Sequence, residues 1–157
     1  PSINQPEDLA LKVEYFKGLA SSTDELKDKT PTETDIISAP QNAKYRIPNY
    51  REYFDDEQYN TIITGYINIP EDGIYYFATN VEEFWLNDEL FISNANRIKR
   101  YSTNDKSVAL KAGYHPIKIT RLCNIIDGWP PMWDAITVSI RNEKDQNFKI
   151  MDETYFK

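Results

Sequence analysis

Residues 64–80, TGYINIPEDGIYYFATN, decide the fold of this 157-residue chain. Apolar and polar side chains alternate on both sides of a central Pro-Glu-Asp-Gly segment at residues 70–73, which is the period of a β-strand with one buried face. Proline presets its φ angle and glycine accepts a positive φ, so this segment predicts a turn. The stretch is therefore expected to be a hairpin of two paired strands, with nothing catalytic in it.

The same alternation continues on both sides of this stretch and predicts an all-β protein. Further strands are expected in residues 11–17, 83–87, 89–93, 107–111, 114–122, 134–142 and 148–156. Asp88 marks a tight corner, Ala112-Gly113 forms another turn, and residues 20–35 are a loop with one helical turn near residues 23–29, capped by Ser22 or Thr23. About eight to ten strands with short turns and little helix predict an antiparallel β-sandwich or barrel.

Composition and charge narrow the function classes. The chain is 27% charged with a net charge of −7 and shows no basic stripe, so nucleic-acid binding is not expected. No apolar run approaches the length of a membrane helix. The single cysteine, Cys123, allows neither an internal disulfide nor a zinc cluster and is interpreted as a buried core thiol.

Domain organisation follows from the first ten residues. The segment PSINQPEDLA is polar and carries two prolines, which is typical of an interdomain linker. Residues 1–10 are therefore predicted to be a linker from a preceding domain, and residues 11–157 a single domain. The chain is expected to be a fragment of a larger protein.

The residues offer little for catalysis. His115 is the only histidine and lies between a turn and a proline, so a structural position at a strand start is predicted rather than a catalytic base. Acidic pairs such as Glu71-Asp72 are interpreted as solvated turns. Glu82 and Glu83 stand apart because they follow a predicted strand end, where two carboxylates could hold a hard cation such as Ca²⁺.

The loop at residues 125–135, IIDGWPPMWDA, is rich in aromatic side chains. Trp129 and Trp133, flanked by Asp127 and Asp134, could stack on sugar rings while the carboxylates bind hydroxyls. The same tryptophans could instead pack on a neighbouring domain or cap the end of a barrel, because tryptophan is usually buried or at an interface. Packing is the favoured interpretation.

Three phrases of the sequence resemble the PA14 domain family. They are the G-Y-I-x-I-P-x-D-G-x-Y-x-F segment at residues 65–77, the short hairpin at residues 84–90, and the L-x-A-G-x-H-P-I-x-I segment at residues 110–119. The opening YFKG of residues 15–18 and the closing IMDETYF of residues 150–156 add to the resemblance. More narrowly, the chain is similar to the PA14 module attached to bacterial family 20 glycoside hydrolases, the β-N-acetylhexosaminidases.

The resemblance implies a non-catalytic accessory module of an exported glycoside hydrolase, periplasmic or extracellular, that binds carbohydrate or packs on the catalytic domain of the same chain. Its expected partners are that domain and an oligosaccharide containing N-acetylhexosamine. An autonomous adhesin or protein-interaction module is the alternative. No cofactor is expected. The candidate carbohydrate-binding residues are Glu82, Glu83, Asn94, Asn96, Arg97, Asp127, Trp129 and Trp133.

The sequence departs from the family pattern where the resemblance implies a calcium loop. The paired aspartates of that loop are replaced by Glu82 and Glu83, and the neighbouring glycine is missing. A shorter loop with longer carboxylates does not easily reproduce the same cation geometry. No metal is therefore expected at this position.

Overall fold

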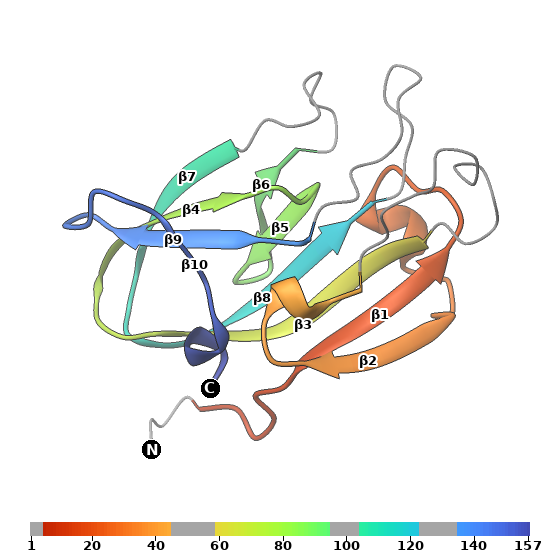
Figure 1. Ribbon diagram of the computed structural model, residues 1–157, viewed down its shortest axis with the longest axis horizontal. Helices are drawn as coiled ribbons and strands as arrows, with labels where there is room; N and C mark the ends of the chain where they lie inside the picture. The colour runs from red at the N-terminus through yellow and green to blue at the C-terminus, as the bar shows by residue number, and fades with distance from the viewer. Residues whose placement is uncertain (1–4, 45–58, 95–103, 123–134) are drawn as a thin grey trace.

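The computed structural model describes residues 5–44, 59–94, 104–122 and 135–157, and it confirms the all-β fold (Figure 1). The described residues form two antiparallel sheets, so the chain is a sandwich rather than a barrel. The first sheet has the strand order β2-β1-β3-β8-β5-β6 and the second has the order β10-β9-β4-β7. The strands are β1 (Leu11–Lys17), β2 (Glu33–Ile37), β3 (Tyr59–Ile69), β4 (Gly73–Thr79), β5 (Glu83–Leu86), β6 (Glu89–Ser93), β7 (Asn104–Leu110), β8 (Gly113–Arg121), β9 (Val138–Asn142) and β10 (Lys149–Ile150), with short 3₁₀ helices η1 (Thr23–Leu26), η2 (Pro40–Asn42) and η4 (Glu153–Phe156).

The core lies between the two sheets. Ile63, Phe84 and Ile119 of the first sheet and Phe77 and Ile140 of the second are at most 1% exposed and belong to one cluster. The ring centres of Phe77 and Phe84 are 5.6 Å apart, within the range favoured by aromatic pairs. The period-2 alternation of the sequence thus places one face of each strand in this cluster.

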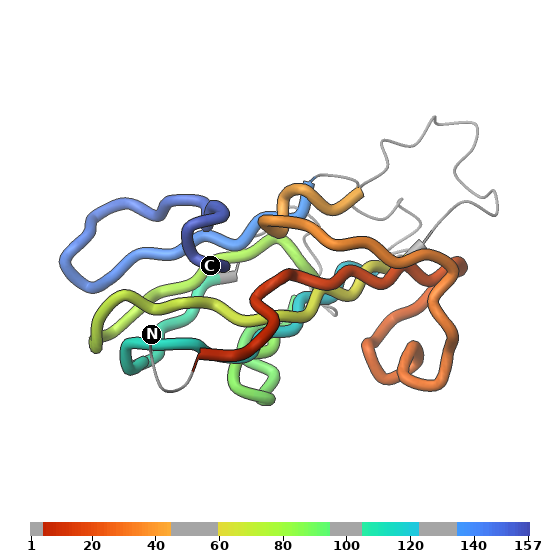
Figure 2. The backbone as a smooth tube through the Cα atoms, turned by 90° about the horizontal axis from the view of Figure 1, so that it is seen from below, coloured from red at the N-terminus to blue at the C-terminus, as the bar shows by residue number. Residues whose placement is uncertain are grey.

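A second, smaller core lies on the outer face of the first sheet. Phe16 and Ile62 are buried there beneath Ala20 and Leu26, together with Leu122. Figure 2 shows the segment around η1 on the side of the first sheet that faces away from β9 and β10. Residues 18–32 therefore cover one end of this outer face.

The opening stretch is not a hairpin, and that prediction is wrong. β3 pairs with β1 and β8, whereas β4 pairs with β7 and β9. The turn after Ile69 therefore carries the chain from the first sheet to the second, and the turn before Gly113 returns it. Gly73 does not adopt a positive φ, whereas Gly113 does, at 120°. Alternation and turn chemistry show that two strands are joined, but not which strands each of them pairs with.

The two turns that cross between the sheets are fastened to each other. The backbone N–H of Ala112 donates to Oδ1 of Asp72 over 2.8 Å. The hydroxyl of Tyr75 donates to the carbonyl oxygen of Glu71 over 2.6 Å. The aspartate of the opening stretch therefore joins two parts of the chain that are 40 residues apart.

Other local expectations are confirmed. Asn87 and Asp88 have φ angles of 52° and 65°, as a two-residue connection between β5 and β6 requires. The helical turn expected near residues 23–29 is η1, with Ser22 at its N-cap. Gly18, which follows β1, has a φ of 105°.

Two expectations about strands need correction. Residues 148–156, predicted as one strand, form only the two-residue β10 followed by η4. Oδ1 of Asp152 accepts from the backbone N–H of Thr154 over 3.0 Å, and this cap begins a helical turn instead of extending the strand. β2, whose first three residues lie inside the loop predicted for residues 20–35, was missed because it is an edge strand with exposed side chains and shows no alternation.

Candidate functional site

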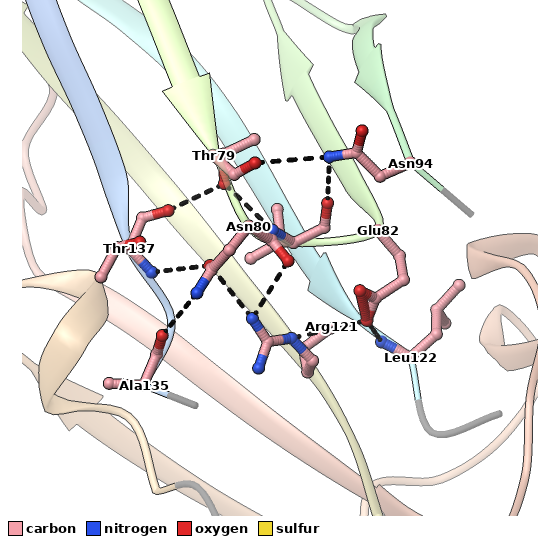
Figure 3. A network of polar contacts seen from close by, with 9 residues as sticks. Thr79, Asn80, Glu82, Asn94, Arg121, Leu122, Ala135 and Thr137 are labelled. Carbon is pink, nitrogen blue, oxygen red and sulfur yellow. Dashed lines mark hydrogen bonds and ion pairs between the residues drawn. The ribbon is translucent and has the colours of Figure 1, made fainter. Parts of the chain in front are cut away.

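Polar side chains gather at the end of the sandwich where β4, β6 and β8 finish (Figure 3). Asn80, just after β4, lies at the centre. Its Nδ2 donates to the carbonyl oxygen of Ala135 over 2.9 Å, and its Oδ1 accepts from the N–H of Thr137 over 3.1 Å and from Nη2 of Arg121 over 3.0 Å. One asparagine therefore connects the ends of β4 and β8 with the segment that leads into β9.

Glu82 forms the second connection in this network. Its Oε1 accepts from the backbone N–H of Leu122 over 2.7 Å and lies 3.4 Å from Nε of Arg121. Both charged side chains are 8% exposed. A carboxylate buried to this extent is stable only when paired and hydrogen-bonded, so the contacts of Glu82 are structural.

Asn94, at the end of β6, completes the network. Its Nδ2 donates to the carbonyl oxygens of Thr79 and Val81 over 3.4 and 2.8 Å. Its backbone N–H donates to the carbonyl oxygen of Glu82 over 2.6 Å. Asn94 is 4% exposed, and its hydrogen bonds fix the path of the chain between β4 and β5.

This network borders two segments that sequence analysis selected for ligand contact. Asn94 directly precedes residues 95–103, Leu122 directly precedes residues 123–134, and Ala135 directly follows them. The three bordering residues belong to one connected set of hydrogen bonds. The described residues that flank both segments therefore lie at the same edge of the sandwich, which we call the loop edge.

Glu83 faces the opposite way from Phe84 and lies on the outer face of the first sheet. Its Oε2 accepts from the N–H of Thr23 over 3.1 Å, and its Oε1 accepts from Oγ1 of Thr23 over 2.8 Å and from Nε1 of Trp85 over 3.1 Å. Glu83 is 6% exposed. It fastens η1 to the sheet and sets the direction of the Trp85 indole.

The structure thus locates three of the predicted site residues. Glu82 and Asn94 lie in one network, while Glu83 belongs to a neighbouring one on the outer face. Asn96, Arg97, Asp127, Trp129 and Trp133 lie outside the described residues, as do Cys123 and Asp134. In the part of the chain that the structure describes, no three His, Cys, Asp or Glu side chains form a group suited to a metal ion.

His115 occupies a structural position in β8. One ring nitrogen, Nε2, lies 2.7 Å from the carbonyl oxygen of Lys111, and Nδ1 lies 3.2 Å from Nδ2 of Asn87. The histidine thereby connects the start of β8 with the corner between β5 and β6. Its bonds to backbone and amide partners agree with the structural role predicted from the sequence.

Trp85 was missed as a candidate. Its alternation with Phe84 and Leu86 places its ring on the outer face of the first sheet, where it is partly exposed. Nζ of Lys118, on the neighbouring strand, lies 5.2 Å from the centre of the ring. The signal was present in the sequence, because a tryptophan two residues from Glu83 must share its face of the strand.

Comparison with known proteins gives a family match and several similar folds. The family model described as "PA14 domain" matches residues 10–153. A curated protein from Porphyromonas gingivalis, named Beta-hexosaminidase, is 43% identical over 86 residues. That match covers 55% of this chain and 11% of the relative, so the chain spans a small part of its length.

Solved structures share the fold at low sequence identity. A protein described as anti-sigma factor domain-containing has a TM-score of 0.65 at 21% identity and covers 99% of this chain and 51% of its own. A Beta-glucosidase from Kluyveromyces marxianus has a TM-score of 0.63 at 17% identity, covering 92% of this chain and 19% of its own. The Epithelial Adhesin 9 A domain from Candida glabrata, solved in complex with Galb1-3GlcNAc, has a TM-score of 0.57 at 10% identity, covering 92% of this chain and 88% of its own.

Within the described residues, no helix of this chain is long and apolar enough to cross a membrane.

Proposed function

The chain belongs to the PA14 domain family, and from that premise we propose that it is a non-catalytic accessory module of an exported glycoside hydrolase of the β-N-acetylhexosaminidase type. The 43% identity to part of a Beta-hexosaminidase supports this placement. Because the match covers only 11% of that relative, the catalytic domain of such a protein would lie elsewhere in the parent chain. The compartment would be periplasmic or extracellular.

The proposed ligand is an oligosaccharide containing N-acetylhexosamine, bound at the loop edge. The observation that carries this proposal is that Asn94, Leu122 and Ala135, which flank residues 95–103 and 123–134, belong to one hydrogen-bond network. Binding sites are commonly built from loops that a rigid scaffold holds. The network supplies such a scaffold.

The candidate residues divide into two roles in this proposal. Glu82, Glu83 and Asn94 are buried and hydrogen-bonded within the protein. Glu82 and Asn94 support the loop edge, Glu83 holds η1 on the sheet, and none of the three is assigned to touch the sugar. The ligand contacts are assigned to Asn96, Arg97, Asp127, Trp129 and Trp133, whose amide, guanidinium, carboxylate and indole groups suit sugar hydroxyls and ring faces. A weak site of this kind acts by proximity, because tethering raises the local substrate concentration at the catalytic domain.

Isothermal titration of the chain with chitooligosaccharides tests the proposal. We expect weak binding that EDTA leaves unchanged and that Trp129→Ala or Trp133→Ala reduces. Binding that both variants leave intact would contradict the assignment of the loop edge. Binding that EDTA abolishes would favour the alternative, a calcium-dependent adhesin module.

Assays on chromogenic N-acetylglucosaminides test the non-catalytic part of the proposal. We expect no turnover by the chain alone at any pH between about 4 and about 9, the range in which ordinary acid–base groups work. Turnover that follows the protein through purification would overturn it.

A further inference from the structure

We propose that the chain carries a second ligand site, separate from the loop edge, in which an uncharged oligosaccharide lies across the outer face of the first sheet. The site is a groove of about 830 Å³, lined by residues that include Tyr66, Trp85, Asp88 and Lys118. Its size lies within the range of about 300–1,000 Å³ that is usual for ligand sites. The segment before β1 borders the groove with Pro6, Glu7 and Asp8, whereas the η1 segment packs over Phe16 and Ile62 on the same face.

One row of side chains runs across the strands in this groove. The registers align Ile36 with Lys12, Lys12 with Thr64, Thr64 with Lys118, and Lys118 with Trp85. A second hollow of about 740 Å³ shares Lys12 and Thr64 with the first and extends to Ile36. Four strand spacings amount to about 19 Å, so the row suits an extended ligand better than a single ring.

Trp85 is the fixed apolar element of the groove. Its indole N–H donates to Oε1 of Glu83 over 3.1 Å, and Glu83 is itself held by the N–H and hydroxyl of Thr23. Because the ring is oriented before any ligand arrives, little conformational entropy is lost on binding. A partly exposed indole of this kind offers its surface to the C–H groups of a sugar ring.

Charged groups of both signs line the groove. The carboxylates are Glu7, Asp8 and Asp88, and the ammonium groups are Lys12 and Lys118. Asp8 and Lys12 form an ion pair at 3.4 Å. The second hollow adds the carboxylates of Glu14 and Asp35, so carboxylates outnumber ammonium groups along the row.

These polar and charged groups indicate the ligand class. Donors and acceptors side by side match hydroxyl groups, which both donate and accept. The excess of carboxylates along the row and the net charge of −7 both oppose a polyanion. An uncharged, hydroxyl-rich chain is the ligand that this chemistry favours.

Backbone amide chemical-shift mapping on the isotope-labelled chain tests the site with three neutral probes, N,N′,N″-triacetylchitotriose, cellotriose and laminaritriose, and one anionic probe, trigalacturonate. At least one neutral probe is expected to shift the amides of Lys12, Thr64 and Lys118. Trp85→Ala is expected to weaken that binding about tenfold, the loss usual for a central aromatic contact. Phe148→Ala, which alters an exposed aromatic side chain elsewhere, is the matched control and should leave the binding unchanged.

Two further variants keep the test decisive if Trp85→Ala disturbs folding. Thr64→Arg fills the middle of the groove from a partly exposed position and should abolish the shifts, while Trp85→Phe keeps an aromatic ring and should retain part of the affinity. The shifts should survive Trp133→Ala, which separates this site from the loop edge. The proposal is overturned if no neutral probe shifts the three amides, if Thr64→Arg leaves binding intact, or if trigalacturonate binds more tightly than every neutral probe.

Discussion

Asp72 shows how a single residue of a turn can connect distant parts of the chain. Its carboxylate is the acceptor for the N–H of Ala112, so the two chain crossings between the sheets are joined at one corner. The backbone carbonyl of the neighbouring Glu71 accepts instead from the hydroxyl of Tyr75. Adjacent acidic residues in one turn therefore have different roles.

Asp72→Ala is expected to lower the free energy of unfolding by about 1 kcal/mol, because one charge-assisted hydrogen bond at an exposed site is lost. Asp72→Asn keeps an acceptor oxygen and should lose less. Urea unfolding followed by circular dichroism measures both, with Glu71→Ala as the matched control. Equal losses for Asp72→Ala and Glu71→Ala would contradict the role given to Asp72.

Gly65 and Gly73 form a natural pair for testing why glycine occurs in the opening stretch. A Cβ added at Gly65 would lie 2.5 Å from Cδ2 of Leu11, whereas at Gly73 the nearest atom would be 3.9 Å away. Leu11 is 1% exposed and belongs to the main core cluster, so a shift of its side chain would disturb its packing in the core.

Gly65→Ala is therefore expected to destabilise the protein by about 1–3 kcal/mol through overpacking. Gly73→Ala should be nearly neutral or slightly stabilising, since Gly73 lacks a positive φ and an added methyl group would lie at an ordinary van der Waals distance from the Tyr75 ring. Thermal unfolding of the two variants beside the wild type measures the difference. Similar melting temperatures for both variants would show that β1 and β3 are less tightly packed than described.

At the scale of elements, the two turns that carry the chain between the sheets, from β3 to β4 and from β7 to β8, join the two layers of the sandwich. β3 and β8 are neighbours in the first sheet, β4 and β7 are neighbours in the second, and the turns between them lie side by side. The opposite ends of β4 and β8 meet in the network of Asn80, Glu82 and Arg121. Polar contacts thus hold both ends of a core that is otherwise apolar.

Arg121→Met tests the strength of the ion pair between Arg121 and Glu82. Removing the guanidinium leaves the buried carboxylate of Glu82 without its ion-pair partner, and such a loss typically costs about 3–5 kcal/mol. The double variant Glu82→Gln with Arg121→Met removes both charges and should recover part of the loss. A double-mutant cycle by urea unfolding measures the coupling, and strict additivity of the two changes would contradict the ion pair.

At the scale of the whole molecule, two buried tyrosines couple stability to pH. Burial raises the pKa of Tyr15 and of Tyr75 above the usual value of about 10. A group whose folded pKa is raised contributes stability that is fully present below its unfolded pKa. That contribution is lost as the pH rises through the folded pKa.

The protein is therefore expected to lose stability above about pH 10, as the tyrosines of the unfolded chain ionise. Tyr15→Phe combined with Tyr75→Phe should flatten this alkaline slope, although it removes two hydrogen bonds at neutral pH. Urea midpoints between about pH 8 and about pH 11 measure the slope for both proteins. An unchanged alkaline slope in the double variant would contradict this origin of the pH dependence.

The sequence alone determined the fold class, the family and most of the strands of this protein. The alternation in residues 11–17, 61–69 and 113–121 shows which side chains are buried, because side chains of a strand point to its two faces in turn. The positive φ angles at Asn87 and Asp88 were also predictable, since few other residues accept them.

Only the tertiary structure decided how these elements pair and what the polar residues do. The same alternation fits a strand in either sheet, so it could not show that β3 and β4 lie in different sheets. The polar edge strand β2 has no alternation of apolar and polar side chains. Glu82 and Glu83 were candidate ligand-binding residues from the sequence, whereas the structure engages Glu82 with Leu122 and Arg121 and Glu83 with Thr23 and Trp85. Strand pairing and burial depend on contacts between residues far apart in the chain, and local sequence periodicity does not specify those contacts.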